Sequence, residues 1–235
     1  MRLLLVTLGV VAGCGDLLGL EAIEAPTAEP PVLIQTKGVA HGDSEGSFPN
    51  IDVTLPSATR GDLMVVAVCF VDGTITTVSD GDTPAYTGLA NKGAIGVLQA
   101  QLFWAQVAAT HSPFSVRVSF VPAATSPDVR IAEYRNVAFP NPVENAGVTS
   151  AANVDSVPLA VMVSQAPALV VAATCVGSQT VEVTNFTIHE ITTPNGDAIA
   201  DLSVARAGPV TAIATQDQVE DMILQLVAFA GGTPP

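Results

Sequence analysis

Two segments without a polar face limit what this chain can fold into. They read LMVVAVCFV at 63–71 and ALVVAATCV at 168–176, and apolar residues occupy odd and even positions in both. A strand of this kind needs cover on both of its faces. We therefore expect these two segments to be the central strands of the fold.

Shorter patterns predict strands and turns in the rest of the chain. Segments 51–55 and 114–120 alternate apolar and polar residues, which is the period of a strand with one solvated face. The pairs at 72–73, 80–81 and 195–196 are Asp-Gly or Asn-Gly, which tolerate the positive φ angles of tight turns. With 19 Gly, 17 Pro and 49% apolar residues, the composition fits many short strands, so we predict an all-β fold.

The order of these segments occurs twice, over about 51–137 and 155–231. Segment 94–109 contains Leu, Gln and Ala, which favour helices, but its place in the repeat favours a strand. Two related halves of this kind can form one jelly-roll-like β-sandwich or two tandem Ig-like sandwiches. Segment 138–154 is either a crossing between two sheets or a linker between two domains.

The amino terminus has the layout of a secretory signal peptide over residues 1–13. Arg2 supplies a positive charge, and the apolar run that follows is too short to span a bilayer and ends at Cys14. The sequence Val11-Ala12-Gly13-Cys14 resembles the lipobox of bacterial lipoproteins, with Val11 where leucine is usual. The resemblance implies cleavage before Cys14 and a lipid on its side chain. The alternative is an ordinary signal peptide followed by an unrelated cysteine.

A lipid on Cys14 would hold the protein at a membrane from that end. Several acyl chains, at ~0.8 kcal/mol for each buried methylene, form a durable anchor. Residue 15 is Gly rather than Asp, which by analogy with enterobacterial sorting favours the outer membrane, with the domain facing the periplasm or the exterior. Residues 14–31 hold three Pro and three Glu, which favours a flexible tether, although 17–23 could form a short amphipathic helix.

A second resemblance covers about residues 32–231. The phrase SPDVRIAEYRNVAFPNPVE at 126–144, with the two central segments before and after it, resembles a bacterial extracellular β-sandwich module of secreted and surface proteins. The two halves of that module occur together, which favours a single domain over 32–232, and the resemblance implies no catalytic residue. Asn136 and Glu144 stand where the module usually has Gly and Asp, and both fit a turn.

The charge balance argues against one class of partner. Eight Lys and Arg against 22 Asp and Glu give a net charge of −14. Nucleic acid is attracted by a basic face. We therefore expect no nucleic-acid partner.

Apart from the lipobox cysteine, the chain has Cys69 and Cys175, one in each central segment. When Val65-Val66 is aligned with Val170-Val171, Cys69 falls opposite Thr174, and Cys175 is shifted by one position onto the opposite face of its strand. The compartment of an exported protein permits oxidation of cysteine pairs to disulfides. This alignment nevertheless predicts two buried free thiols rather than a disulfide.

The residues that could bind a metal are scattered along the sequence. His41, His111 and His189 are not spaced as ligands of one ion, and no Cys-x-x-Cys pair occurs, so we expect no zinc site and no cofactor. Asp80 and Asp82 could offer oxygen ligands to calcium, but their spacing does not complete an EF-hand loop. An acidic hairpin turn is the alternative.

Glu133 shares the parity of Val129 and Ile131 and is therefore expected to point inward. A buried carboxylate can act as a catalytic acid, but glycoside hydrolysis needs a second carboxylate at a fixed distance, and no spacing identifies one. We favour a structural partner for Glu133, such as Arg130, Arg135 or a backbone amide.

These patterns contain no assembled catalytic constellation, so we predict a protein that is not an enzyme. The favoured function is a lipid-anchored cell-envelope or surface protein with a structural or adhesive β-sandwich, whose partners are the membrane and a protein or glycan surface. The alternative is a carbohydrate-binding module in which Tyr86 and Trp104 form an aromatic platform, although a single Trp more often packs in a core. A hydrolase of envelope polysaccharides is the third candidate.

Overall fold

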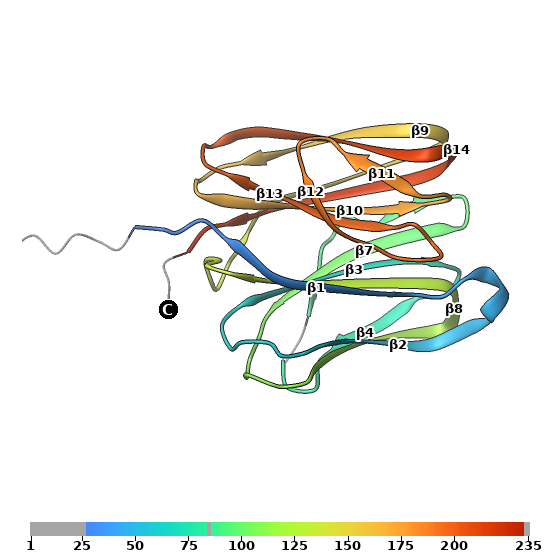
Figure 1. The fold of residues 1–235 in the computed structure, drawn as a ribbon, viewed down its shortest axis with the longest axis horizontal. Coiled ribbons are helices and arrows are strands. Elements are labelled where there is room, and N and C mark those ends of the chain that lie inside the picture. The colour runs from blue at the N-terminus through green and yellow to red at the C-terminus, as the bar shows by residue number, and fades with distance from the viewer. Residues whose placement is uncertain (1–26, 84–85, 233–235) are drawn as a thin grey trace, which may run out of the picture.

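The structure is a computed structural model that describes residues 27–83 and 86–232. Over these residues the chain forms 14 strands in antiparallel sheets, with one 3₁₀ turn at Asp43–Glu45 and no α-helix, which confirms the all-β prediction (Figure 1). In the described ranges we find no helix with the length and apolar character needed to cross a membrane. The predicted signal peptide, Cys14 and most of the predicted tether lie outside the described residues.

The strands belong to two sheets, one from each half of the chain. The eight-stranded sheet contains β1 (Val32–Ala40), β2 (Ser47–Leu55), β3 (Leu63–Val71), β4 (Ile75–Ser79), β5 (Thr87–Gly88), β6 (Gly93–Ile95), β7 (Leu98–Gln106) and β8 (Phe114–Arg135). The six-stranded sheet contains β9 (Val143–Val163), β10 (Ala168–Val176), β11 (Thr180–Val183), β12 (Thr187–Ile191), β13 (Ala198–Val204) and β14 (Gly208–Ala230).

Each of the two apolar segments is the central strand of its sheet, as predicted. β3 pairs with β7 on one side and β8 on the other, and β10 pairs in the same way with β13 and β14. Every residue of β10 and every residue of β3 except Val71 is buried. Both strands are covered on their two faces.

The longest strand of each half folds its sheet into two layers. β8 pairs with β1 and β3 through its C-terminal part and with β2 and β4 through its N-terminal part. β14 pairs with β10 through its C-terminal part, with β11 through its N-terminal part, and with β9 along most of its length. Each half is therefore a small β-sandwich with its own apolar core.

The order of strand pairing is the same in both halves. β3, β7 and β8 correspond to β10, β13 and β14, while β4 corresponds to β11. The single strand β9 takes the places of both β1 and β2. Most of segment 138–154, which we expected to be a crossing or a linker, forms the first part of β9.

A third core joins the two halves face to face. Leu63, Val65 and Ala67 of β3 point into this inter-half core from one side, and Leu169, Val171 and Ala173 of β10 point into it from the other. The alternate residues of both strands fill the core of their own half. In Figure 1 the sheet layers containing β3 and β10 lie in the middle, with β9 at the top and β2 at the bottom.

Candidate functional site

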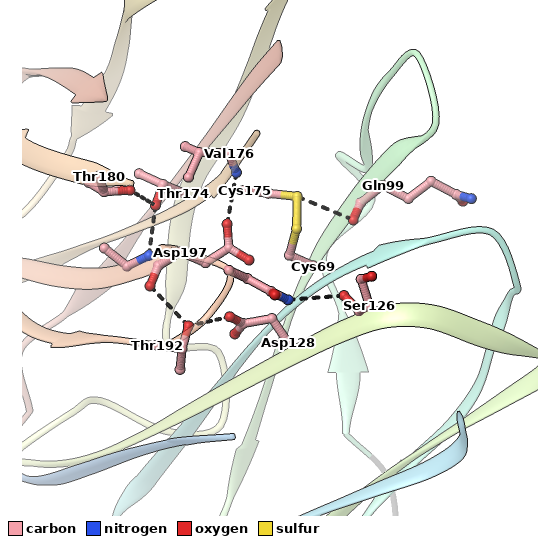
Figure 2. Close-up of a disulfide and its surroundings, with 12 residues drawn as sticks. Cys69, Gln99, Ser126, Asp128, Thr174, Cys175, Val176, Thr180, Thr192 and Asp197 are labelled. Atoms are coloured by element: carbon pink, nitrogen blue, oxygen red, sulfur yellow. Dashed lines mark hydrogen bonds between the residues drawn. A yellow bond between two sulfur atoms is a disulfide. The ribbon is translucent and has the colours of Figure 1, made fainter. Parts of the chain in front are cut away.

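A disulfide joins the two halves at the inter-half face. It links Cys69 of β3 to Cys175 of β10, whose Cα atoms are 5.4 Å apart, and both residues are buried (Figure 2). The prediction of two free thiols is therefore wrong.

The error lies in a register shift of one residue. The alignment of Val65-Val66 with Val170-Val171 matched the inter-half face of β3 with the inner face of β10. When the alignment is shifted by one residue, Val65 matches Val171 and Cys69 matches Cys175. All four side chains belong to the inter-half face. Because the halves pack through this face, the two equivalent cysteines meet.

Buried polar side chains surround the disulfide at the junction of the two halves (Figure 2). Arg130 Nε lies 2.9 Å from Asp128 Oδ1. Arg130 Nη1 donates hydrogen bonds to the carbonyl oxygens of Thr174, at 2.8 Å, and Ala198, at 2.6 Å. The hydroxyl of Thr192 donates to Asp128 Oδ2. Since Asp128 and Arg130 come from the first half and their other partners from the second, this cluster holds the halves in register.

Asp197 completes the cluster and is fully buried. Its Oδ1 accepts a hydrogen bond of 2.8 Å from the backbone N–H of Val176, while its Oδ2 has no hydrogen-bond partner among the described residues. Burial, and then the neighbouring Asp128, raise the pKa of Asp197 well above its ordinary value. Burial also raises the pKa of Asp128, but Arg130 and Thr192 oppose that rise. The two carboxyl groups thus oppose each other's ionisation, while Arg130 favours the ionised form of Asp128.

A cleft of about 620 Å³ opens beside the disulfide. Its lining includes Cys69 and four carboxyl residues, which are Asp197, Asp217, Glu220 and Asp221. Among the described residues, Cys69, Cys175 and Asp197 are the one group whose ligand atoms, all within 4.8 Å of one another, could hold a metal ion. With the two sulfur atoms bonded to each other, no thiolate is left as a ligand, so the oxidised cluster does not fit a metal.

The predicted calcium ligands lie in a hydrogen-bonded turn. Asp80 Oδ1 accepts from the backbone N–H groups of Asp82, at 3.0 Å, and Thr83, at 2.6 Å, and Asp80 Oδ2 accepts from the hydroxyl of Tyr86 at 3.1 Å. Although burial opposes it, hydrogen bonding from Thr83, Asp82 and Tyr86 lowers the pKa of Asp80 overall. Asp82 instead pairs with His111 Nε2 at 2.5 Å. The two carboxylates thus have separate partners within the chain and do not converge.

Tyr86 and Trp104 are near neighbours, because Thr87 pairs with Trp104, but their side chains belong to different cores. Tyr86 is buried in the first-half core, and burial together with Asp80 raises the pKa of its hydroxyl. Trp104 lies on β7 and packs on the inter-half core. The structure does not bring the two rings together, so they form no common platform for a sugar.

Trp104 has a different aromatic neighbour, Phe139, which follows β8. The two ring centroids are 6.4 Å apart and their planes are tilted by 38°. Both rings line a groove of about 540 Å³, which we call the Trp104 groove. Its lining comprises Arg60, Gly61, Thr83, Thr87, Trp104, Ala105, Gln106, Val107, Ala108, Phe139 and Pro140.

Glu133 points inward, as its parity predicted, and is fully buried. Its carboxylate accepts hydrogen bonds from the backbone N–H of Thr59, at 2.7 Å, and from Gln35 Nε2, at 2.5 Å. Burial raises the pKa of the nearby Asp62, although Arg135, whose Nη2 lies 3.3 Å from Asp62 Oδ2, opposes the rise. Of the partners expected for Glu133, the structure selects a backbone amide.

Each of the three histidines has a carboxylate partner of its own. His41 Nδ1 lies 2.6 Å from Glu45 Oε2. His189 Nε2 lies 3.0 Å from Asp201 Oδ2. With His111 paired to Asp82, the histidines do not form one ligand set.

Comparisons with known protein families and with curated proteins gave no match for this chain.

Sequence reasoning missed Arg60 and Phe139 in the Trp104 groove and the partners of Arg130 at the inter-half junction. Each of these residues meets residues far away in the chain, such as Arg130 and Ala198, which are 68 positions apart. One available signal was the shared Leu-x-Val-x-Ala-x-Cys spacing of Leu63 to Cys69 and Leu169 to Cys175. That spacing sets the correct register of the two halves.

Proposed function

We propose that this chain is an exported, non-catalytic protein of the bacterial cell envelope, anchored by a lipid on Cys14 and serving a structural or adhesive role. The observation that carries the export step is the buried disulfide between Cys69 and Cys175. Disulfides persist in oxidising compartments outside the cytoplasm. This agrees with the signal-peptide layout of residues 1–13.

The non-catalytic role is supported by what the buried carboxylates do. Glu133 accepts hydrogen bonds from Thr59 and Gln35, and Asp128 pairs with Arg130 and Thr192. Each of these groups satisfies a donor inside the fold. These carboxylates therefore stabilise the fold through their hydrogen bonds and ion pairs.

The anchor is tested with a Cys14→Ser variant expressed in a bacterial host beside the unaltered chain. We expect the unaltered chain in the membrane fraction, with a lipid mass on Cys14, and the variant in the soluble extracytoplasmic fraction. The body carries an excess of negative charge, so anionic headgroups repel it and the lipid alone should retain it. A variant that stays in the membrane fraction after a high-salt wash would contradict the proposal, and a Cys69→Ser variant with Cys14 intact serves as the control.

A second candidate function is saccharide binding, favoured by the Trp104 groove. Aromatic rings that line a groove beside polar groups are a common way to bind sugars and other small ligands. A surface protein with this capacity would combine anchoring with recognition of a glycan. An array of neutral and acidic oligosaccharides tests this function independently of the anchor.

A further inference from the structure

We propose that the Trp104 groove binds a uronic-acid residue of a saccharide chain. The proposal rests on the second candidate function, saccharide binding, and does not depend on the lipid on Cys14. Three features of the groove carry it: its rings, its charge and its free hydrogen-bonding groups.

The rings of Trp104 and Phe139 supply an apolar surface for the C–H face of a sugar ring. Both rings are half-buried, since each packs on the inter-half core and also lines the groove. They come from β7 and from the segment after β8, and packing of the inter-half core fixes both. The apolar side of the groove is thus already formed before a ligand arrives, which lowers the entropic cost of binding.

Arg60 sets the charge of the groove. It is the one charged residue among the described residues that line it, in a chain with 22 acidic and 8 basic residues. Its guanidinium forms no ion pair or hydrogen bond with a described residue, unlike that of Arg117, which pairs with Asp52 at 2.7 Å. A free guanidinium matches a carboxylate with two parallel hydrogen bonds. A uronic acid carries such a carboxylate directly on the sugar ring.

Thr87 and Gln106 provide groups for the sugar hydroxyls. The hydroxyl of Thr87 is free of hydrogen bonds within the described chain, and Gln106 Nε2 donates to the carbonyl of Gly61 at 3.2 Å, which leaves the Gln106 carbonyl oxygen available. The volume of about 540 Å³ falls in the range of small-ligand sites, roughly 300–1,000 Å³. The groove can therefore hold a sugar unit while the rest of the saccharide extends into solvent.

The test uses calorimetric titration of the purified protein with oligogalacturonate and with the same oligosaccharide after methyl esterification of its carboxyl groups. The ester keeps the ring and removes the charge, so we expect the acid to bind at least about tenfold more tightly than the ester. Oligomers of glucuronate and mannuronate, each with its ester, extend the test to other linkages.

Variants separate the charge from the rings. Arg60→Gln should lower affinity for the acid about tenfold and leave affinity for the ester unchanged. Phe139→Leu keeps an apolar side chain without a ring and should weaken binding of both forms. Arg206→Gln, an exposed cation outside the groove, and Lys92→Gln, which lines a separate groove beside Phe103, are the charge controls and should bind as the unaltered protein does.

The outcomes distinguish recognition of uronic acid from saccharide binding in general. If acid and ester bind equally, or if Arg60→Gln leaves the affinity for the acid unchanged, recognition of uronic acid is wrong although saccharide binding stands. If no acidic or neutral oligosaccharide binds, both are wrong, whereas the location of the Cys14→Ser variant still decides the anchor.

Discussion

Asp197 combines complete burial, a carboxyl oxygen that has no hydrogen-bond partner in the described part of the chain, and a neighbouring carboxylate. With its pKa raised in the folded protein, the folded state holds a proton that the unfolded chain releases above the ordinary Asp pKa of about 4. This group therefore contributes its full stability below about pH 4, and that contribution falls as the pH rises through the window up to the raised value.

An Asp197→Asn variant should remove this dependence, because the amide does not titrate and still offers an oxygen to the N–H of Val176. From about pH 4 upward, the stability of the variant relative to the unaltered protein should grow by up to about 1.4 kcal/mol for each pH unit within the window. Urea unfolding between pH 4 and pH 8 measures the difference. Asp217→Asn is the control: hydrogen bonding from the Gln179 N–H lowers the pKa of Asp217, so its effect should be confined to acid conditions.

At the residue scale, alternation along a strand predicted which way a side chain points, but it did not predict which residue that side chain contacts. The inward direction of Glu133 followed from its spacing to Ile131, since alternation along a strand is local. The pairing of Cys69 with Cys175 depended on which faces of two distant strands meet, and a shift of one residue reverses that answer. The Trp104 groove is similar, because Arg60, Trp104 and Phe139 come from separate segments of the chain that meet only in the folded protein.

Strands of one half cross strands of the other at two equivalent places, and a glycine lies at each. A Cβ on Gly38 of β1 would lie 2.3 Å from Thr192 Cγ2, and a Cβ on Gly93 of β6 would lie 2.3 Å from Ile223 Cγ2 and 3.1 Å from Val148 Cγ2. When the two halves are matched strand by strand with Cys69 on Cys175, Gly38 of the first half takes the position of Val148 in the second. In the same way, Thr192 takes the position of Gly93. Each crossing therefore pairs one glycine with a β-branched residue.

A Gly93→Ala substitution should therefore push β6 away from β9 and β14. We expect the free energy of unfolding to fall by about 1–3 kcal/mol, the usual cost of overpacking a rigid contact. Gly147→Ala on β9 is a matched control, because its nearest contact would be the flexible Leu159 side chain at 3.3 Å. Equal losses of stability for the two variants in urea unfolding would contradict the crossing argument.

At the element scale, the central strands were predictable and the edges were not. β3 and β10 are buried on both faces and therefore have apolar residues on both faces, a pattern that can be recognised in the sequence. Segment 94–109, expected as one strand, divides into β6 and β7, because Gly96 adopts a φ of +55° in a turn and the two strands pair with each other. The first part of β9 contains Asn, Gly, Thr and Ser, which resemble a linker, and it becomes a strand because β14 offers a partner along its length.

At the scale of the whole molecule, the inter-half core and the disulfide should make the two sandwiches unfold together. Leu226 is fully buried in the second-half core, and Leu226→Ala should lower the free energy of unfolding by about 2–5 kcal/mol. The single Trp and both Tyr lie in the first half, and Trp104 and Tyr134 contact the inter-half core, so their fluorescence reports the first half and its contact with the second. We expect the variant to shift the fluorescence transition as far as the circular dichroism transition, which reports both halves.

Two transitions by circular dichroism in this variant, in place of a single one, would show that the halves unfold independently. A first-half substitution of the same kind, Val66→Ala, is the control, since it should shift both signals whether or not the halves are coupled. The comparison between the two variants therefore tests whether the inter-half core couples the unfolding of one half to that of the other.

The bond between Cys69 and Cys175 joins a residue to its own counterpart in the other repeat. In a twofold dimer, only a residue near the symmetry axis can touch the same residue of the second subunit. The chain thus has the arrangement that gene duplication and fusion of a cysteine-linked homodimer would leave behind. A single repeat carrying one cysteine would, on this account, be an ancestral subunit that could assemble with its twin before the two were encoded as one polypeptide.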